Sequence, residues 1–186
     1  MRKPIAIFFL FLLYANAKTM AQQEQIATPP GQATAKTPQG PWAAPISQAL
    51  SNANKELVRQ FIDEVRSGKN PDKTASFMAD TVLAHQENAE GETIVKRTPG
   101  DYADHVRDFL RMYGKYSFEI TELIAENDKV YVRWKQTGRH LAEIDGHPPT
   151  GKPLVEIASA VYRVKNNRIA EYWIQIDRLG FEKQLQ

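Results

Sequence analysis

The sequence has no cysteine among its 186 residues. It can therefore form no disulfide, present no thiolate nucleophile and build no cysteine-ligated metal site. Histidine is scarce too, and the four histidines lack the close spacing to acidic side chains that a metal site requires. A glycine-rich phosphate-binding loop is missing as well. The sequence therefore predicts neither a metal nor a cofactor.

Long apolar runs are also missing, apart from one at the N-terminus. Arg2 and Lys3 precede an apolar run over residues 5–14, and Ala15–Asn16–Ala17 offers a small-residue cleavage site. The run is shorter than the about 20 residues that a membrane-spanning helix needs. We interpret residues 1–21 as a cleaved signal peptide, with an uncleaved anchor as the alternative. We expect a periplasmic or secreted protein with no membrane attachment after cleavage.

The chain carries no large excess of charge of either sign. It has 24 basic and 22 acidic residues, but Arg2, Lys3 and Lys18 leave with the signal peptide. The mature chain then has 21 basic and 22 acidic residues, a net charge of −1. This balance gives no electrostatic reason to expect a nucleic-acid partner.

Residues 22–50 are rich in Gln, Ala, Thr and Pro and show no hydrophobic period. Such a segment cannot bury enough apolar surface to offset the entropy lost on ordering, so we predict a disordered linker. Apolar residues recur at helical spacing from residue 51 onward. We therefore predict one folded domain over residues 51–186.

The first half of this domain reads as mostly helical. The periodicity predicts an amphipathic helix over residues 57–65 that ends at Gly68. Asn70–Pro71 restarts a helix, and residues 81–86 form a short strand. Residues 87–97 are polar and contain a glycine, so we expect a loop there. Thr98–Pro99–Gly100–Asp101 then resembles a capping box that opens a third helix, which ends at Gly114.

The second half reads as four long strands in two hairpins. The strands are expected over residues 116–124, 129–140, 154–165 and 168–177, with turns at Glu126–Asn127–Asp128 and Asn166–Asn167. Antiparallel hairpins with helices on one face indicate an α+β fold. A strongly curved sheet around one helix leaves an interior that its own side chains do not fill, and such a cavity is a natural ligand site.

The last strand carries the main catalytic candidate. Alternation places Glu171, Trp173, Gln175 and Asp177 on one face. Burial beside an aromatic ring would raise the pKa of the Asp177 carboxyl, as a general acid or base near neutral pH requires. We therefore expect Asp177 to lie dry at one end of the cavity. The alternative is a strand-end residue bonded to a nearby helix or turn.

Other residues could complete this site, and each also has a structural interpretation. His140, which shares a strand face with Trp134 and Gln136, could hold a substrate oxygen or simply bond across the sheet. His85 could line the pocket or be exposed. The aromatic and amide candidates for the walls are Phe109, Tyr113, Trp134, Gln136, Trp173 and Gln175. Glu156 and Glu171 are most simply members of buried ion pairs with Arg133 or Arg163.

Two segments carry a family resemblance. GRHLAEIDGHPPTGKPL (residues 138–154) and NNRIAEYWIQIDRLGFEKQLQ (residues 166–186), with the order of the elements, resemble the SnoaL-like polyketide cyclase or ester cyclase family. The resemblance covers roughly residues 54–186. It implies the cone-shaped, cystatin-like α+β fold of the nuclear-transport-factor-two-like superfamily, with helices packed on a strongly curved, mostly antiparallel sheet.

The resemblance also implies a chemistry. Characterised polyketide cyclases of the family close a ring by intramolecular aldol condensation without metal or cofactor, and their acid/base matches Asp177 here. Arg139 stands where the family usually has Thr. The family further implies a small-molecule ligand and a homodimer formed through the outer sheet face, where Tyr131, Arg133 and Tyr162 would otherwise be an exposed patch.

We therefore expect an exported enzyme with cofactor-independent acid/base catalysis, either aldol-type cyclisation or isomerisation, on a small, partly apolar carbonyl compound. Asp177 and His140 would be its catalytic residues. One alternative is a non-catalytic periplasmic domain that binds a small molecule or a protein. Another is an epoxide-hydrolase-like activity, for which Glu171 and Arg133 are the candidates to accompany Asp177.

Overall fold

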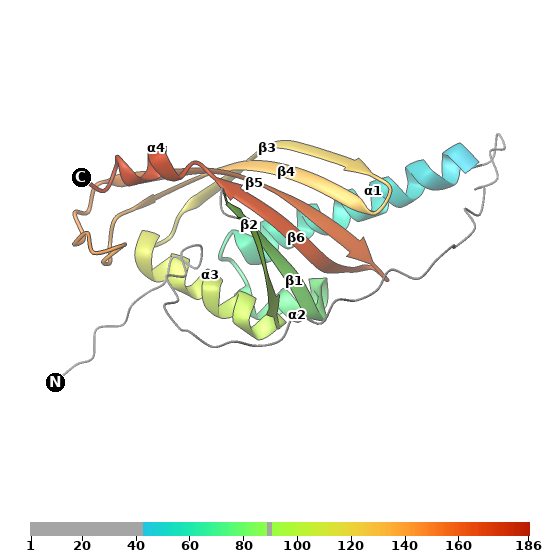
Figure 1. Ribbon diagram of the computed structural model, residues 1–186, viewed down its shortest axis with the longest axis horizontal. Helices are drawn as coiled ribbons and strands as arrows, with labels where there is room; N and C mark the ends of the chain where they lie inside the picture. The colour runs from blue at the N-terminus through green and yellow to red at the C-terminus, as the bar shows by residue number, and fades with distance from the viewer. Residues whose placement is uncertain (1–42, 89–90) are drawn as a thin grey trace.

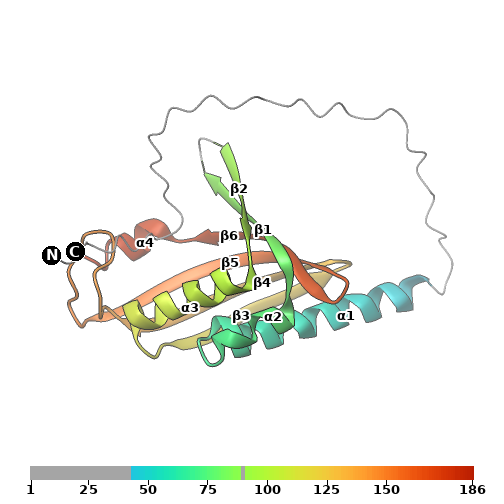
Figure 2. The same cartoon turned by 90° about the horizontal axis from the view of Figure 1, so that it is seen from below.

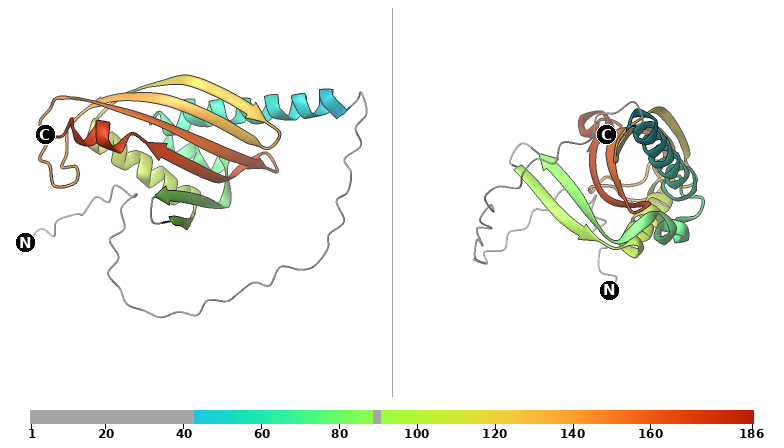
Figure 3. Two further views of the ribbon diagram at one scale, coloured as in Figure 1. Left: turned by 45° about the horizontal axis from the view of Figure 1, so that its top comes forward. Right: turned by 90° about the vertical axis from the view of Figure 1, so that its right-hand side faces the viewer.

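The computed structural model of the protein describes residues 43–88 and 91–186. These residues form one six-stranded sheet, in the order β2-β1-β6-β5-β4-β3, with helices α1, α2 and α3 on its inner face (Figures 1 and 2). Seen from its end, the sheet curls around α1 and α3, while the β1–β2 hairpin extends away from the body (Figure 3). The expected α+β class and curved sheet are confirmed.

The first helix, α1, spans Ala43–Phe61 and therefore begins inside the segment expected to be a linker. It continues into a π-helical turn, η1 (Ile62–Arg66), and Gly68 follows in the left-handed conformation at φ +81°. A Cβ at Gly68 would be strained at this φ and would also lie 2.8 Å from Leu110 Cδ2. The expected helix end at Gly68 is thus confirmed.

The next elements differ in part from expectation. A 3-10 turn, η2 (Pro71–Lys73), leads into α2 (Thr74–Phe77), so the predicted restart at Asn70–Pro71 is confirmed. The following strand, β1, is long and spans Met78–Asn88. The predicted loop over residues 87–97 is wrong, because Gly91–Arg97 forms strand β2, antiparallel to β1. Its β-branched Thr93, Ile94 and Val95 explain why it extends.

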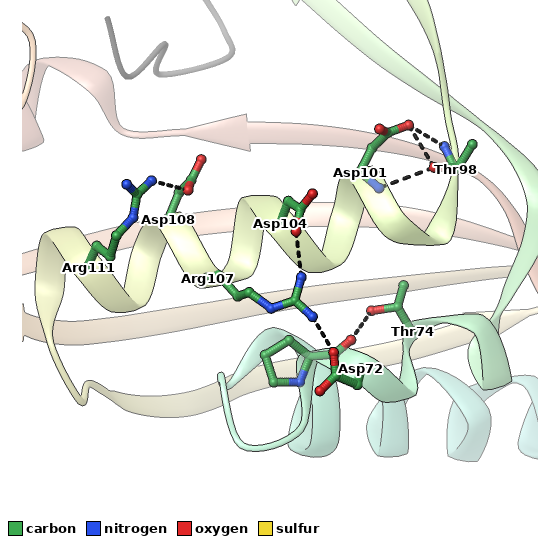
Figure 4. Close-up of polar contacts among 9 residues, drawn as sticks. Asp72, Thr74, Thr98, Asp101, Asp104, Arg107, Asp108 and Arg111 are labelled. Atoms are coloured by element: carbon green, nitrogen blue, oxygen red, sulfur yellow. Dashed lines mark hydrogen bonds and ion pairs between the residues drawn. The ribbon is translucent and has the colours of Figure 1, made fainter. Parts of the chain in front are cut away.

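The third helix, α3 (Pro99–Tyr113), begins at the predicted capping box. Thr98 Oγ1 accepts from the Asp101 backbone N–H, and the Asp101 carboxylate accepts from the Thr98 N–H (Figure 4). Further along the helix, Arg107 contacts both Asp104 and Asp72, which ties α3 to the η2 turn (Figure 4). The aromatic side of α3 is thereby held against the sheet.

The four long strands are confirmed with small shifts of their ends. They are β3 (Ser117–Glu126), β4 (Lys129–Arg139), β5 (Pro153–Lys165) and β6 (Arg168–Ile176), and each pairs antiparallel with the next. The sheet is nevertheless mixed, since β1 runs parallel to β6. A short helix, α4 (Arg178–Glu182), follows β6.

Strand alternation separates an inner face from an outer face. Val132, Ala160 and Ile174 are cross-strand neighbours on the inner face, where the main core lies. Tyr162 belongs to this inner set and is only 1% exposed. Its expected place in an exposed outer patch is therefore wrong, because it alternates with Val161 and faces the helices.

The proposed signal peptide, and the linker up to residue 42, lie outside the described residues. Within residues 43–88 and 91–186, no helix combines the length and apolarity needed to cross a membrane.

Candidate functional site

A buried arginine lies at the centre of the inner face. Arg66, at the end of the η1 turn, has a side chain only 2% exposed. Its Nη1 donates to Gln136 Oε1 at 2.9 Å, and its Nη2 donates to Glu156 Oε1 at 3.2 Å. The guanidinium carbon also lies 4.4 Å from the centroid of the Phe109 ring. Hydrogen bonds and a cation–π contact thus offset part of the cost of burying this charge.

The groups around Arg66 keep unused hydrogen-bonding capacity. Gln136 and Glu156 are direct cross-strand neighbours on β4 and β5. Gln136 Nε2, Glu156 Oε2 and the Tyr113 hydroxyl are buried and have no hydrogen-bond partner within the described residues. Buried polar atoms in folded proteins are nearly always bonded to protein or to ordered water, so these three atoms can bond a buried water or a polar ligand.

The environment of Glu156 changes its acidity. Burial raises the pKa of its carboxyl, while the Arg66 charge and the Trp134 indole lower it, and the net result is a raised pKa. The Trp134 N–H nevertheless does not reach hydrogen-bonding geometry. Burial likewise raises the pKa of Tyr113 well above its ordinary value, so its hydroxyl stays protonated and can donate. A raised carboxyl pKa is what a general acid or base near neutral pH requires.

The structure brings four of the predicted wall residues together around Arg66. Gln136 bonds to Arg66, Phe109 and Trp134 place their rings over its guanidinium, and the Tyr113 ring lies 5.6 Å from the Phe109 ring. All four side chains are buried in the structure. A ligand therefore reaches them only when neighbouring side chains move aside.

His140 lies just past the end of β4 and is fully buried. Its backbone pairs with the following loop, because its N–H donates to Lys152 O and its carbonyl accepts from Gly151 N. In the ring, Nδ1 lies 3.4 Å from Thr150 Oγ1, whereas Nε2 has no hydrogen-bond partner among the described residues. The structural interpretation thus accounts for one ring nitrogen and leaves the other free for a ligand.

The expected environment of Asp177 is wrong. Strand β6 ends at Ile176, and Asp177 is an exposed residue that caps α4 by accepting from the Gly180 backbone N–H at 2.9 Å. The Asp177 carboxylate is thus not buried beside an aromatic ring, as the catalytic hypothesis required. The alternative, a strand-end residue bonded to a nearby helix, describes the observed contact. A catalytic role for Asp177 stays a prediction without this physical support.

The remaining predicted residues lie on the opposite face of the sheet. His85, Trp173 and Gln175 line a pocket of about 320 Å³ on the outer face, over β4, β5, β6 and β1. His85 stacks on Trp173 with ring centroids 4.4 Å apart. The expectation that these residues share one cavity with Trp134 and Gln136 is wrong, because alternation along β4 and β6 sends the two groups to different faces.

The two unusual glutamates occur in ion pairs, as one interpretation predicted. Glu171 pairs with Arg163 and with His85, whereas Glu156 pairs with Arg66 and not with Arg133 or Arg163. Arg133 instead lies 3.4 Å from Glu122 on the surface. The Glu171 and Arg133 side chains required by the epoxide-hydrolase alternative are thus engaged elsewhere.

Sequence reasoning missed Arg66. A signal was present, since Val58, Ile62 and Arg66 are spaced four residues apart and place a charge on the buried stripe of the helix. His105 is offset from the apolar stripe of its helix, which predicts a solvated ring. The ring instead packs against Phe109, with ring centroids 4.5 Å apart. Burial lowers the pKa of His105 to about 3, with smaller effects from nearby arginines.

The inner cluster can perform proton transfer beside a polarised oxygen. Glu156 can accept or return a proton, while Arg66, Gln136 and Tyr113 present donors to a carbonyl or enolate oxygen. Within residues 43–88 and 91–186, no three His, Asp or Glu side chains come together as metal ligands would.

Comparisons with known proteins agree with this architecture. The strongly curved sheet packed against helices is a nuclear-transport-factor-two-like α+β fold. Within that class, a sequence profile described as SnoaL-like polyketide cyclase matches residues 56–185, and the chain belongs to this family. No curated protein matches the sequence.

Solved structures of other proteins share this fold. A protein from Acidithiobacillus ferrooxidans assigned as a polyketide cyclase is 28% identical, with a TM-score of 0.64 over 73% of this chain and 96% of that one. IdmH from Streptomyces antibioticus, also assigned as a polyketide cyclase, is 20% identical, with a TM-score of 0.60 over 71% and 97%. An LEH-like epoxide hydrolase from M. tuberculosis is 15% identical, with a TM-score of 0.54 over 73% and 90%, and shows shared fold alone.

Proposed function

We propose that this chain is a cofactor-independent enzyme that performs acid/base chemistry on a small, partly apolar carbonyl compound bound at the inner face of the sheet. The observation that carries the proposal is the buried carboxylate of Glu156. One of its oxygens bonds to Arg66 and the other has no partner among the described residues. Its raised pKa suits removal and return of a proton at a carbon next to a carbonyl.

The proposed reaction divides the work among three side chains. Glu156 takes the proton from the carbon, and Arg66 and Tyr113 stabilise the enolate oxygen that forms. Attack of the enolate carbon on a second carbonyl of the same molecule forms the ring bond and an alkoxide, which takes the proton back from Glu156 to give the aldol product. Return of the proton to another carbon of the enolate system gives isomerisation instead. Phe109 and Trp134 supply the apolar wall for the carbon skeleton. Glu156 thus takes the role that the sequence suggested for Asp177.

The proposal can be tested with a simple carbon acid. We expect the protein to accelerate deuterium incorporation beside the carbonyl of 2-tetralone in D₂O, followed by proton NMR. Glu156→Gln should lower this rate at least about 100-fold, as expected for loss of a general base. Asp177→Asn is the matched control, because it removes a charge from an exposed cap and should leave the rate within about twofold. Full activity of Glu156→Gln, with loss in Asp177→Asn, would reverse the assignment.

The competing proposal is a domain that binds a small molecule without turnover. The burial of the whole inner cluster favours it, since a covered site suits retention of a ligand. It predicts that the protein binds 2-tetralone, by calorimetry, yet leaves its exchange rate unchanged. An epoxide-hydrolase-like activity would instead show as diol formation from a small cyclic epoxide. Glu156 would be its acidic group, as the only buried acidic side chain among residues whose burial is described.

We further propose that the protein acts outside the cytoplasm, as a homodimer. The N-terminal segment Met1–Ala21 supports export, and the intact mass of protein recovered from a periplasmic or culture fraction should correspond to a chain cut after Ala17 or Ala21. The dimer rests on the family resemblance. Sedimentation analysis at micromolar concentration measures it, and a monomer at that concentration would contradict it.

A further inference from the structure

One cation on the inner face of the sheet has no acidic partner. Arg97 is the last residue of β2 and pairs with Val82, a core residue of β1, so the two side chains share the inner face. Among the residues that the structure describes, Arg97 makes no ion pair, and its buried Nε atom has no hydrogen-bond partner. Folding has therefore already removed part of the hydration of this guanidinium, and an anionic oxygen of a ligand would replace it.

Two polar groups accompany Arg97 on this side of the core. Burial is the main cause of the low pKa of the His105 ring and of the raised pKa of the Tyr172 hydroxyl, and the Arg97 charge acts on both pKa values. Arg97 therefore lies within electrostatic reach of both groups. The Tyr102 ring contacts both, with its centroid 6.4 Å from that of His105 and 6.1 Å from that of Tyr172. The neutral His105 ring and the Tyr172 hydroxyl can each donate one hydrogen bond to a ligand.

The acidic residue nearest to Arg97 in the sequence does not neutralise it. The Asp101 carboxylate accepts hydrogen bonds from the backbone N–H and the hydroxyl of Thr98 in the capping box (Figure 4). These two bonds are the main cause of the lowered pKa of Asp101, and the Arg97 charge has the smallest effect on it. Arg97 thus keeps its N–H groups available for another partner.

A series of contacts joins Arg97 and His105 to the inner cluster. The His105 ring lies 4.5 Å from the Phe109 ring, and the Phe109 ring lies 4.4 Å from the Arg66 guanidinium, between centroids in the first case and to the guanidinium carbon in the second. Arg66 in turn bonds to Glu156. Arg97 and His105 are partly exposed, whereas Phe109, Arg66 and Glu156 are buried. The series therefore leads from the surface to the buried carboxylate.

We propose that Arg97 binds a carboxylate of the substrate while the carbonyl of the same molecule lies at Glu156 and Arg66. This inference rests on the proposed function and names its substrate class, a cyclic ketone with a carboxylate at the far end of its ring system. The guanidinium and the His105 N–H donate to the carboxylate, and the ring system packs on Phe109. The site lies on the inner face, so a dimer formed through the outer face leaves it open.

The charge of the site favours a carboxylate over a phosphate. A phosphate monoester carries a charge of about −1.5 to −2 at neutral pH, whereas a carboxylate carries one negative charge. Arg97 supplies one positive charge, the neighbouring His105 ring is neutral, and Asp101 lies near enough to lower the local potential. A single negative charge is therefore the better match.

The test compares 2-tetralone with 6-carboxy-2-tetralone, which places a carboxylate at the far end of the rings from the ketone. Calorimetry near neutral pH should give the carboxylate a dissociation constant about tenfold lower, as expected for one charge-assisted hydrogen bond. Salt at about 0.15 M screens the exposed charges beyond about 8 Å. Binding is measured separately from deuterium exchange, so the test does not depend on turnover.

Matched variants test the role of Arg97. Arg97→Gln should lower the ratio of the two dissociation constants from about ten to about one. Lys96→Gln is the control, because it removes an exposed positive charge from the adjacent residue, whose side chain faces the opposite side of β2, and should keep the ratio near ten. Arg97→Lys keeps the charge but loses the planar fork, so it should give an intermediate ratio.

Two results would overturn the proposal. The first is equal affinity of the wild-type protein for the two ketones, a result that needs no variant to fold. The second is an equal fall of the ratio in Arg97→Gln and Lys96→Gln. The outcome for catalysis is distinguishable: tighter binding of the carboxylate without exchange would reject catalysis by Glu156 and retain the role of Arg97, whereas exchange of both ketones with equal affinity would do the reverse.

Discussion

Arg66→Met should be among the most destabilising single substitutions in the domain. Arg66 is 2% exposed in its side chain and bonds to Glu156, whose side chain is fully buried. Methionine preserves much of the side-chain length but leaves the carboxylate without its cation. Removal of one partner from a buried pair typically costs about 3–5 kcal/mol, because the other charge stays uncompensated. For a domain of this size the melting temperature should fall by about 10 °C.

The loss of stability in Arg66→Met should depend on pH. Burial already holds the pKa of Glu156 above its ordinary value of 4.5, and loss of Arg66, which lowers it, would raise it further. A carboxyl with a raised folded-state pKa contributes stability that is fully present below the unfolded value and is lost as pH rises through the folded value. The stability of Arg66→Met should therefore be closest to that of wild type near pH 4.5, and the difference should grow as pH approaches neutrality.

Urea unfolding followed by circular dichroism at pH 4.5 and 7.5 measures both effects. Arg59→Met is the matched control, since Arg59 lies on the same helix in an exposed pair with Glu56 and should cost less than about 1 kcal/mol. The double variant Arg66→Met/Glu156→Met should recover most of the loss, because an apolar pair carries no buried charge. The reasoning fails if Arg66→Met costs no more than Arg59→Met, or if its deficit is the same at both pH values.

Three further perturbations test other parts of the structure. The His105 ring should stay neutral, with no change in its NMR shift between pH 8 and pH 4, because its pKa falls to about 3 on folding. The wild-type protein should therefore lose stability as pH drops below 6.5, and His105→Gln should remove this loss. A normal titration of the ring near pH 6.5 would contradict this prediction. Thr98→Ala should cost about 1 kcal/mol through loss of the capping box, measured by thermal unfolding, whereas Thr98→Ser should retain most of it. Gly138→Ala should cost about 1–3 kcal/mol, because its Cβ would lie 2.7 Å from Tyr113 Cβ; unchanged stability would mean that α3 can shift.

The fold could be predicted well where the pattern is local. Residues that favour one backbone geometry predict three kinds of feature correctly. These are the capping box at Thr98, the helix end at Gly68, and the hairpin turns at residues 126–128 and 166–167. Strand β2 was missed because most of its residues are polar and exposed, and its two apolar residues, Ile94 and Val95, are adjacent, so no alternation distinguishes it from a loop. The parallel pairing of β1 with β6 could not be predicted, since it joins segments far apart in the sequence.

The site could be predicted only in part, because alternation gives two faces without saying which is buried. On β6, Trp173 and Gln175 were taken for the inner face on account of the aromatic ring. The other set, Tyr172, Ile174 and Ile176, is more apolar and is the one that packs on the core. Assigning Trp173 and Gln175 to the inner face also placed Asp177 there wrongly. The partnership of Arg66 with Glu156 joins residues 90 positions apart, which no local pattern reveals.

The alternation of side chains along β6 has consequences for the evolution of this protein. Because consecutive side chains from Glu171 to Ile176 lie on opposite faces of the sheet, a substitution at an odd-numbered position there changes the outer face, while the even-numbered positions keep the interior intact. The two faces of this strand can therefore evolve independently of each other. An insertion of a single residue, in contrast, would move every following side chain of the strand to the opposite face of the sheet.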